Sequence, residues 1–193
     1  MPLMFPMRSE GKPQITAVYA DRTYPTHLGY HTGWDCNYYY DWVKRKNIAG
    51  DGDLGLPFLA VADGEVKYIS NHAGGLWGGL IVIWHEQYGI YSRYGHDLLE
   101  QDLIKVGDRV TAGQEIGRIG KGERGTFLAH LHIDFPRQIP GDERGAPFYA
   151  FWPGRNRDMC RTFFVDPSKL YQKFRAATPD MHDEMRLFTS AYR

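Results

Sequence analysis

The 193-residue sequence lacks an excess of charge of either sign. Lysine and arginine together number 23, and aspartate and glutamate together number 23, so the formal net charge is zero. Binding to nucleic acid or to an anionic membrane ordinarily needs a basic excess, and we therefore expect neither partner. The sequence also lacks any run of about eighteen consecutive apolar residues, so it predicts no transmembrane segment.

Cysteine is scarce, and no export leader is recognisable at the N-terminus. The two cysteines, Cys36 and Cys160, are too few for a disulfide framework in a chain of this size, which favours two reduced, partly buried thiols. The first residues, Met1 to Arg8, have neither the basic start nor the apolar stretch of a signal peptide. We therefore expect no signal peptide in this sequence.

The sequence is rich in residues that form short strands and tight turns. Aromatic residues make up 15% of it, and it contains 22 glycines and 11 prolines, which suits short strands better than a helical bundle. Apolar or alternating runs separated by glycine predict a mainly β fold, an antiparallel β-sandwich or barrel-like core. Leu80–Trp84 is apolar throughout, as in a strand buried on both faces. The predicted strands are Ile15–Ala20, Phe58–Val61, Glu65–Ile69, Leu80–His85, Ile90–His96, Glu115–Ile119 and Ala129–Phe135.

This pattern divides the chain into three segments: an irregular lead-in over 1–30, a compact core over 31–137 and a C-terminal extension over 138–193. Within the core, residues 38–46 predict one or two helical turns. In the extension, Asp166 and Thr178 each stand directly before a proline, a signal for the start of a helix. Apolar residues recur at helical spacing after both signals and are expected to pack on the β core: Leu170, Phe174, Met181, Met185 and Phe188.

The strongest local motif is His130-Leu131-His132-Ile133-Asp134-Phe135. Side chains alternate along a strand, so His130, His132 and Asp134 share one face and the three apolar residues share the other. An apolar back anchors such a strand in a core, and two imidazoles at this spacing can share one site. They can act as two metal ligands or as one ligand and one catalytic base.

Two further segments contribute candidate residues. His31 and Asp35 stand four residues apart and can converge on one cation from a helix face or a bent loop; the nearby Gly33 and Pro25 favour the loop, and a plain polar turn is the alternative. Tyr94 and His96 end a strand-like run and face the same way if the strand alternates regularly.

Taken together, these residues match a catalytic metal site. His31, Asp35 and one histidine of the His-x-His pair would give zinc three protein ligands and leave its fourth position to water, as in catalytic rather than structural zinc sites. If Asp35 lies on an extended segment, its neighbour Cys36 points away from the metal and into the core.

Several ordered motifs between His31 and Phe135 resemble the lysostaphin-type zinc metallopeptidases, which are peptidoglycan endopeptidases with an early His-x-x-x-Asp motif and a late His-x-His motif. The sequence departs from the family pattern in a long connection over Tyr38–Leu54, in Ile133-Asp134 after the His-x-His pair where Phe-Glu is more common, and in its extension after Arg137. Beyond the ligand motifs, the resemblance lies in a first hairpin, a strand pair that ends in Tyr-x-His, and a Gly-Asp…Gly-Gln turn: Leu56–Val66, Leu80–Leu98 and Val106–Gly117.

The resemblance implies a role for each candidate residue. His31, Asp35 and His132 would bind one Zn²⁺, and His96 and His130 would form the catalytic pair. Glycine-rich loops over 71–79 and 120–125 would border the substrate groove. Among the aromatic residues, Tyr94, Trp77 and Tyr38 are expected to line that groove; Trp34, Tyr39, Tyr40 and Trp152 are further candidates, although most of these aromatic residues are expected to pack in the interior.

The resemblance therefore predicts a zinc-dependent endopeptidase that hydrolyses the stem or cross-bridge peptides of bacterial peptidoglycan. One alternative is a catalytically inert cell-wall-binding or activator module of the same fold, although such modules usually lack ligands or the catalytic histidine. A phosphocarrier is a third reading, but it leaves His31 and Asp35 unexplained. The substrate lies on the periplasmic or extracellular face of the cell, so the absence of a visible leader suggests phage-type release from the cytoplasm.

Overall fold

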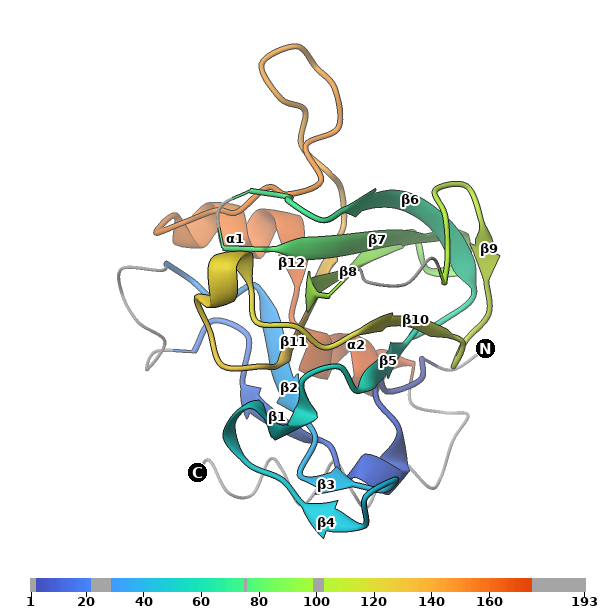
Figure 1. Cartoon of the computed structure of the whole chain (residues 1–193). Helices are drawn as coiled ribbons and strands as arrows, with labels where there is room; N and C mark the ends of the chain where they lie inside the picture. The colour runs from blue at the N-terminus through green and yellow to red at the C-terminus, as the bar shows by residue number, and fades with distance from the viewer. Residues whose placement is uncertain (1–2, 22–28, 75, 99–102, 175–193) are drawn as a thin grey trace.

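The structure is a computed structural model of the chain, and it describes residues 3–21, 29–74, 76–98 and 103–174. One large antiparallel sheet dominates the described part (Figure 1). Its strands in spatial order are β1 (Gln14–Ala17), β2 (Gly33–Asn37), β11 (Leu131–Pro136), β8 (Ile90–Asp97), β7 (Gly79–His85), β6 (Gly64–Ser70) and β9 (Arg109–Val110), with β12 (Phe164–Val165) paired to β11.

A second, two-stranded sheet of β5 (Pro57–Leu59) and β10 (Glu115–Arg118) covers one face of the large sheet. The main hydrophobic core lies between the two layers, where Phe58 and Ile116 of the small sheet share one buried cluster with Ile81 and Ile133 of the large sheet. Burial of such apolar surface between packed layers is the main favourable term in folding. The predicted antiparallel, mainly β core is confirmed, with layers of unequal size.

Strand β7 is buried on both faces, as its uninterrupted apolar sequence predicts. Ile81 and Ile83 belong to the main core, whereas Leu80 and Val82 face the other way and belong to a smaller cluster. That second cluster is covered by the chain that follows β11, through Ala150 and the partly buried Trp152. The C-terminal extension thus closes the second face of the sheet.

The N-terminal segment differs from the predicted irregular lead-in over 1–30. Strand β1 pairs with β2 at the edge of the large sheet, and Leu3 and Met7 lie buried in the main core. The predicted strand over Ile15–Ala20 is present in part, as β1. Three prolines among residues 1–14 leave little periodicity before it, and the order there comes from contacts with distant residues. A short 3₁₀ helix, η1 (Ser9–Gly11), precedes β1.

The prediction of helical turns over 38–46 is wrong. This segment forms a hairpin of β3 (Tyr40–Asp41) and β4 (Lys46–Asn47), followed by the 3₁₀ helix η2 (Gly50–Asp53). Asp41 caps the turn, since its Oδ1 accepts hydrogen bonds from the backbone N–H groups of Val43 and Lys44. An Asx turn of this kind competes with a helix for the same backbone donors.

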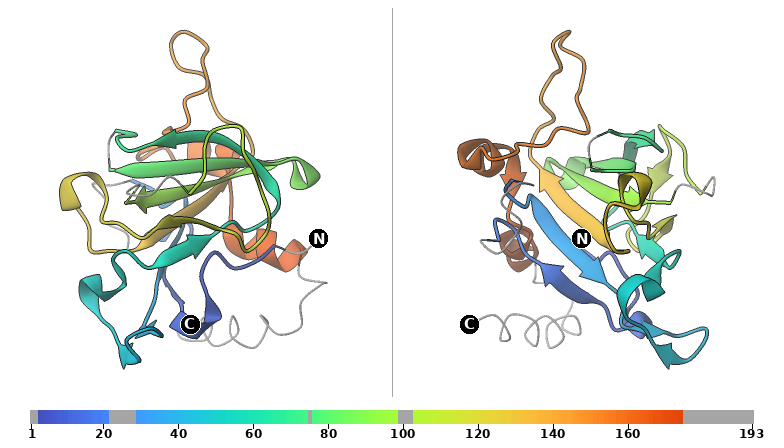
Figure 2. Two further views of the ribbon diagram at one scale, coloured as in Figure 1. Left: turned by 45° about the vertical axis from the view of Figure 1, so that its right-hand side comes forward. Right: turned by 60° about the vertical axis from the view of Figure 1, so that its left-hand side comes forward.

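The extension carries two short helices, α1 (Arg157–Phe163) and α2 (Pro167–Lys173). Helix α2 begins as predicted, with Asp166 accepting a hydrogen bond from the backbone of Ser168, and its Leu170 packs in the main core. Figure 2 shows α2 against the large sheet, where Tyr171 stacks on Trp34 at 5.2 Å between ring centroids. Helix α1 was not predicted, and the helix expected after Thr178 lies outside the described residues.

The division of the chain at residue 137 stays a prediction. In the described ranges, no helix is long and apolar enough to cross a bilayer.

The two remaining 3₁₀ helices lie in turns next to the sheets. They are η3 (Glu86–Tyr88), between β7 and β8, and η4 (Glu123–Gly125), after β10.

Candidate metal centre and the residues around it

His31, Asp35 and His132 meet where β2 pairs with β11. His132 lies directly opposite Asp35 in the antiparallel register, and His31 stands just before β2. Nε2 of His31 is 2.9 Å from Oδ1 of Asp35 and 3.1 Å from Nδ1 of His132, and Nδ1 of His132 is 3.0 Å from the same carboxylate oxygen. Three side chains from distant parts of the sequence therefore point one atom each at a common centre.

The second nitrogen of each ring fixes its tautomer. Nδ1 of His31 lies 2.9 Å from the carbonyl oxygen of Val18, and Nε2 of His132 lies 3.3 Å from Oδ2 of Asp134. A carbonyl and an ionised carboxylate only accept hydrogen bonds, so these two nitrogens carry the hydrogens. Once a metal displaces any proton held there, the nitrogens that face Asp35 can offer their lone pairs, the state in which histidine binds a metal.

Three electron-pair donors about 3 Å apart need a positive charge between them. Burial would raise the pKa of Asp35, but the charges of His31 and His130 and the hydrogen bonds to His132 and His31 hold it well below its usual value, so the carboxylate is ionised. Burial alone would lower the pKa of His132, yet hydrogen bonds to Asp134 and Asp35 raise it to about 9. The site therefore attracts a cation, either a proton on His132 or a metal ion.

The spacing of the three atoms fits a tetrahedral metal. Ligand atoms about 2.0–2.1 Å from a tetrahedral zinc ion lie about 3.3 Å from one another. The three observed separations, 2.9, 3.0 and 3.1 Å, are slightly shorter than this edge. Two imidazoles and one carboxylate are also a usual donor set for catalytic zinc, so the residues present fit the ion.

A buried ion pair supports His132 from behind. Arg93 donates two hydrogen bonds to Asp134, at 2.7 and 2.5 Å, and the side chains of both residues are inaccessible to solvent. The hydroxyl of Thr32 donates to the same carboxylate at 2.5 Å. Although burial would raise the pKa of Asp134, the charge of Arg93 holds it far below its usual value, so this carboxylate is ionised. The ring of His132 is thereby held in one orientation and one tautomer.

His96 reaches the site because β8 carries a bulge. Leu80 of β7 lies opposite Gly95 and Gly79 lies opposite Asp97, so His96 is the extra residue, with a left-handed φ of +67°. Strict alternation would point His96 into the core beside Tyr94, and the predicted common direction of these two side chains is wrong. Bulges next to active sites commonly re-aim a side chain in this way.

His130 and His96 form a second pair of imidazoles beside the three converging side chains. Their ring centroids are 4.5 Å apart, and Nε2 of His130 is 3.6 Å from Oδ1 of Asp35. Nδ1 of His130 donates to the carbonyl of Leu128, and Nδ1 of His96 donates to that of Trp77, which leaves Nε2 bare in both rings. Burial, followed by the charges of His130 and His132, holds the pKa of His96 well below its usual value. Each of the five residues singled out in the sequence thus lies in one cluster.

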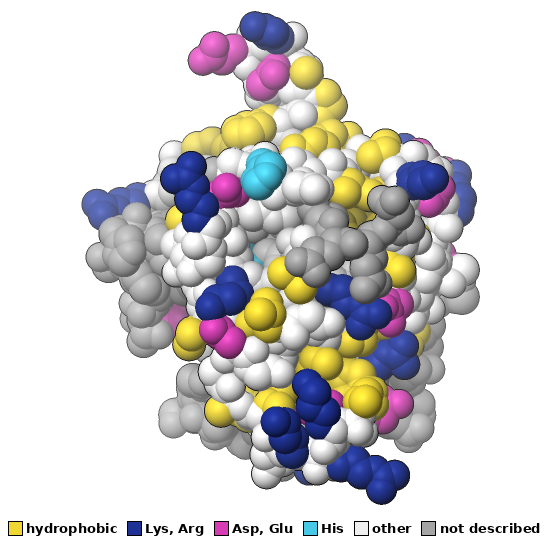
Figure 3. Space-filling model, viewed as in Figure 1, with side chains coloured by type: hydrophobic (Ala, Val, Ile, Leu, Met, Phe, Trp, Pro, Cys, Tyr) yellow, Lys and Arg dark blue, Asp and Glu magenta, His cyan; other side chains and the backbone are white. Residues whose placement is uncertain are grey.

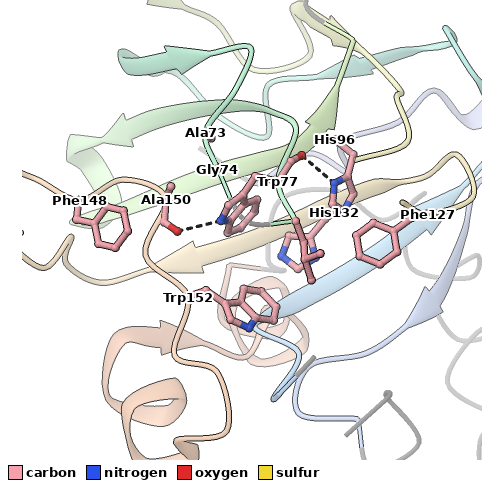
Figure 4. Close-up of a pocket in the computed structure, with 10 residues that line it drawn as sticks. Ala73, Gly74, Trp77, His96, Phe127, His132, Phe148, Ala150 and Trp152 are labelled. Atoms are coloured by element: carbon pink, nitrogen blue, oxygen red, sulfur yellow. Dashed lines mark hydrogen bonds between the residues drawn. The ribbon is translucent and has the colours of Figure 1, made fainter. Parts of the chain in front are cut away.

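Only one of the three residues predicted to line the groove lies next to a cavity. Trp77 borders a cavity beside His96 and His132 (Figure 4), together with Trp152. Tyr94 is fully buried and stacked on Phe58, and Tyr38 is 2% exposed with its hydroxyl donating to the carbonyl of Pro57, so neither reaches the groove. Both rings fill the core that positions β2 and β8.

Gly33 and Cys36 show why the early motif folds as a strand and not as the expected bent loop. A Cβ atom on Gly33 would lie 1.9 Å from the carbonyl oxygen of Ile133, so only glycine lets β2 approach β11 this closely. Alternation then directs Asp35 to the site, and it directs Cys36, which is fully buried, into the main core as predicted.

Comparison with known proteins identifies the family. The sequence profile of peptidase family M23 matches residues 46–143, half of the chain. The chain belongs to peptidase family M23. The matched residues include His96, His130 and His132 but begin after His31 and Asp35. The resemblance inferred from the motifs is confirmed.

The curated M23-like relatives are similar over about half of this chain. A lipoprotein NlpD/LppB homolog of Pseudomonas aeruginosa is 36% identical over 94 residues, which are 49% of this chain and 30% of that protein. The murein hydrolase activator NlpD of Escherichia coli K12 is 34% identical over 90 residues, which are 47% of this chain and 22% of that protein. The chain therefore matches less than a third of either relative's length.

Solved structures show the same fold. The catalytic domain of the antimicrobial peptidase lysostaphin from Staphylococcus simulans aligns with a TM-score of 0.54 at 20% identity and covers 85% of this chain and 96% of that domain. At this identity the likeness concerns the fold alone. It extends to most of the chain, including parts that lie outside the M23 profile match.

Proposed function

We propose that this protein is a zinc-dependent endopeptidase that hydrolyses peptide cross-links of bacterial peptidoglycan. The observation that carries the proposal is the convergence of one donor atom each from His31, Asp35 and His132, with the imidazoles of His96 and His130 beside them. These three residues would hold one Zn²⁺ ion. Membership in a peptidase family supports hydrolysis of a peptide bond as the reaction.

The two remaining histidines would handle the protons of this reaction. Bound zinc would polarise a substrate carbonyl and make water nucleophilic near neutral pH. His96 and His130 each present a bare Nε2 toward the site, so each can accept a proton there and donate it again. A ring held by a carbonyl at Nδ1 keeps its orientation while it changes charge at Nε2. The two rings would divide proton transfer and stabilisation of the developing oxyanion between them.

Peptidoglycan is the substrate that the comparisons favour. One relative is named a murein hydrolase activator, and a protein of the same fold is an antimicrobial peptidase. Cross-linking peptides exist only in the cell wall, so the protein would act on its periplasmic or extracellular face. Phage-type release from the cytoplasm remains our proposal for how it reaches the wall.

An inert activator module is the second candidate, because a sequence relative carries that name. An activator needs the fold but no proton transfer, and nothing would then keep the full set of five side chains in place. Here all five are present. Each of the four histidine rings makes a hydrogen bond at one nitrogen, which orients the ring and leaves its other nitrogen for the site. This arrangement favours the enzyme.

Digestion of defined, cross-linked muropeptides, read by mass spectrometry, tests the proposal. We expect cleavage of a cross-link by the zinc-loaded protein, loss of cleavage with a chelator, and recovery when Zn²⁺ is restored. Asp35→Asn should abolish cleavage together with zinc binding. His72→Ala is the matched control, because the side chain of His72 is 84% exposed and lies outside the cluster. Absence of any product with zinc present, alongside stimulation of a separate murein hydrolase, would establish the activator instead.

A further inference from the structure

A cavity of about 350 Å³ opens directly beside the five-residue cluster (Figure 4). His96 and His132 form one side of it, and Trp77 forms another. The opposite wall is the segment 148–152, which contributes Phe148 and Trp152. A peptide whose scissile bond lies at the cluster would therefore place a neighbouring residue in this cavity.

The wall formed by residues 148–152 is held in place by three consecutive backbone carbonyls. Arg93 donates to the carbonyls of Tyr149 and Phe151 at 2.9 and 2.7 Å, and the indole N–H of Trp77 donates to that of Ala150 at 2.9 Å. Arg93 is fully buried, and all three of these bonds are made within the chain itself. The wall is therefore preorganised, which lowers the entropy cost of binding.

Among the residues that the structure describes, no acidic residue, lysine or arginine lines this cavity. Its lining consists of aromatic rings, small apolar residues and the two histidines. Hydrophobic side chains continue outside it, where Phe148 is 46% exposed. Figure 3 shows hydrophobic side chains at the base of the projecting hairpin and charged ones at its tip. A basic group that entered the cavity would lose its hydration and gain no partner of opposite charge, and an acidic group would meet only the ring of His132, which Asp35 and Asp134 already pair.

We propose that this cavity is a specificity subsite that receives an uncharged, apolar amino-acid residue next to the scissile bond. The inference rests on the proposed function, since it assumes that a peptide lies across the cluster. The M23 profile match ends at residue 143, so the wall lies outside the matched residues. Phe148 and Trp152 are specificity-determining residues in this view, and they leave the chemistry at the five-residue cluster unchanged.

Peptide binding to the full-length, metal-free protein tests the subsite independently of catalysis. The probes are three blocked tripeptides, N-acetyl-Ala-X-Ala-amide with X as leucine, glutamate or lysine, and the readout is the NMR signal of each tryptophan indole. We expect the leucine peptide to shift the signals of Trp77 and Trp152, to leave that of Trp84 in place, and to bind at least about tenfold more tightly than the charged peptides. Equal binding of all three peptides would overturn the proposal.

Variants of the wall separate the subsite from the fold. Trp152→Ala should weaken binding of the leucine peptide about tenfold, and Trp84→Ala, at a tryptophan outside the cavity, should not. Phe148→Arg changes an exposed position, so it should fold normally and favour the glutamate peptide. If Trp152→Ala and Phe148→Arg both leave the preference unchanged, the subsite is wrong.

The same variants distinguish this failure from failure of the proposed function. If the protein cleaves muropeptides and the wall variants leave its substrate preference unaltered, the endopeptidase proposal stands and the subsite proposal fails. If the protein binds the leucine peptide selectively but cleaves no muropeptide, the apolar binding site stands and the endopeptidase proposal fails.

Discussion

The carboxylate of Asp134 lies directly behind His132, with Oδ2 3.3 Å from Nε2 of the ring. It also contacts the guanidinium of Arg93, on the neighbouring strand β8, and the hydroxyl of Thr32, which stands just before β2. Arg93 also holds the wall of the cavity through the carbonyls of Tyr149 and Phe151. One buried ion pair therefore orients a proposed metal ligand and positions the proposed subsite at the same time.

Replacing Asp134 should weaken zinc binding although the residue is no ligand. Asp134→Asn removes the charge that fixes the tautomer of His132, and loss of such a partner typically lowers metal affinity about 10- to 100-fold. It also leaves Arg93 buried without its counter-charge, which we expect to cost about 3–5 kcal/mol of stability. Competition with a chromophoric chelator, on protein shown to be folded by circular dichroism, measures the affinity.

Asp41→Asn is the matched control for this experiment. Asp41 is also a buried carboxylate, but it caps the β3–β4 turn and has no contact with the cluster. Its replacement should reduce stability and leave zinc affinity unchanged. Unchanged zinc affinity in Asp134→Asn would show that the ion pair serves the fold alone.

The two catalytic candidates should behave differently when truncated. His130 is partly exposed and lies on ordinary backbone, so His130→Ala should fold and bind zinc normally while hydrolysis falls about 10²- to 10⁴-fold. His96 has a left-handed φ, which asparagine tolerates better than alanine. His96→Asn should therefore be as inactive as His96→Ala but about 1 kcal/mol more stable. Urea denaturation and muropeptide cleavage measure the two effects; equal stability of the His96 variants would mean that the φ carries no strain.

The sequence alone predicted the residues of the candidate site better than their directions. Spacing and strand alternation singled out His31, Asp35, His130 and His132, and the resemblance to the lysostaphin-type family supplied their roles and the role of His96. Regular strands such as β7 were predictable for the same reason.

Features that depend on pairing between distant strands could not be predicted. The bulge at His96 is defined only by the residues that pair with it on β7. Regular alternation gives Tyr94 the same direction as His96, so Tyr94 was assigned to the groove, although it packs in the core. The partnership of Arg93 with Asp134 requires that β8 and β11 be neighbours, which no local pattern reveals. The hairpin at β3–β4 follows from an Asx turn at Asp41, a signal that was present in the sequence but is compatible with the start of a helix.

Zinc should stabilise the folded protein measurably. The three converging electron pairs repel one another unless a cation lies between them, and the unfolded chain does not bring them together. Zinc at about one hundred times its dissociation constant should add about 2.7 kcal/mol to the free energy of unfolding. Differential scanning calorimetry with and without Zn²⁺ measures the shift, and Asp35→Asn should remove most of it. A wild-type melting temperature that does not respond to zinc would contradict the site.

Acid should destabilise the fold through His85, which lies outside the cluster. This buried ring donates from Nδ1 to the carbonyl of Asp63 and accepts a hydrogen bond from Ser92 at Nε2. Burial outweighs the favourable hydrogen bond to Asp63 and lowers the pKa of His85 below its usual value. Below about pH 6.5 the unfolded chain therefore binds more protons at His85 than the folded chain does. The stability that the neutral ring contributes is complete above that pH and is lost as the pH falls toward the folded-state pKa.

His85→Gln isolates this contribution, because glutamine stays neutral at every pH used while the other histidines are unchanged. The difference in unfolding free energy between wild type and His85→Gln should be larger at about pH 7.5 than at about pH 5, and each unit by which the pKa is lowered corresponds to about 1.4 kcal/mol. Urea denaturation at the two pH values gives the difference. A difference for His85→Gln that does not change with pH would mean that this ring titrates alike in the folded and unfolded chain.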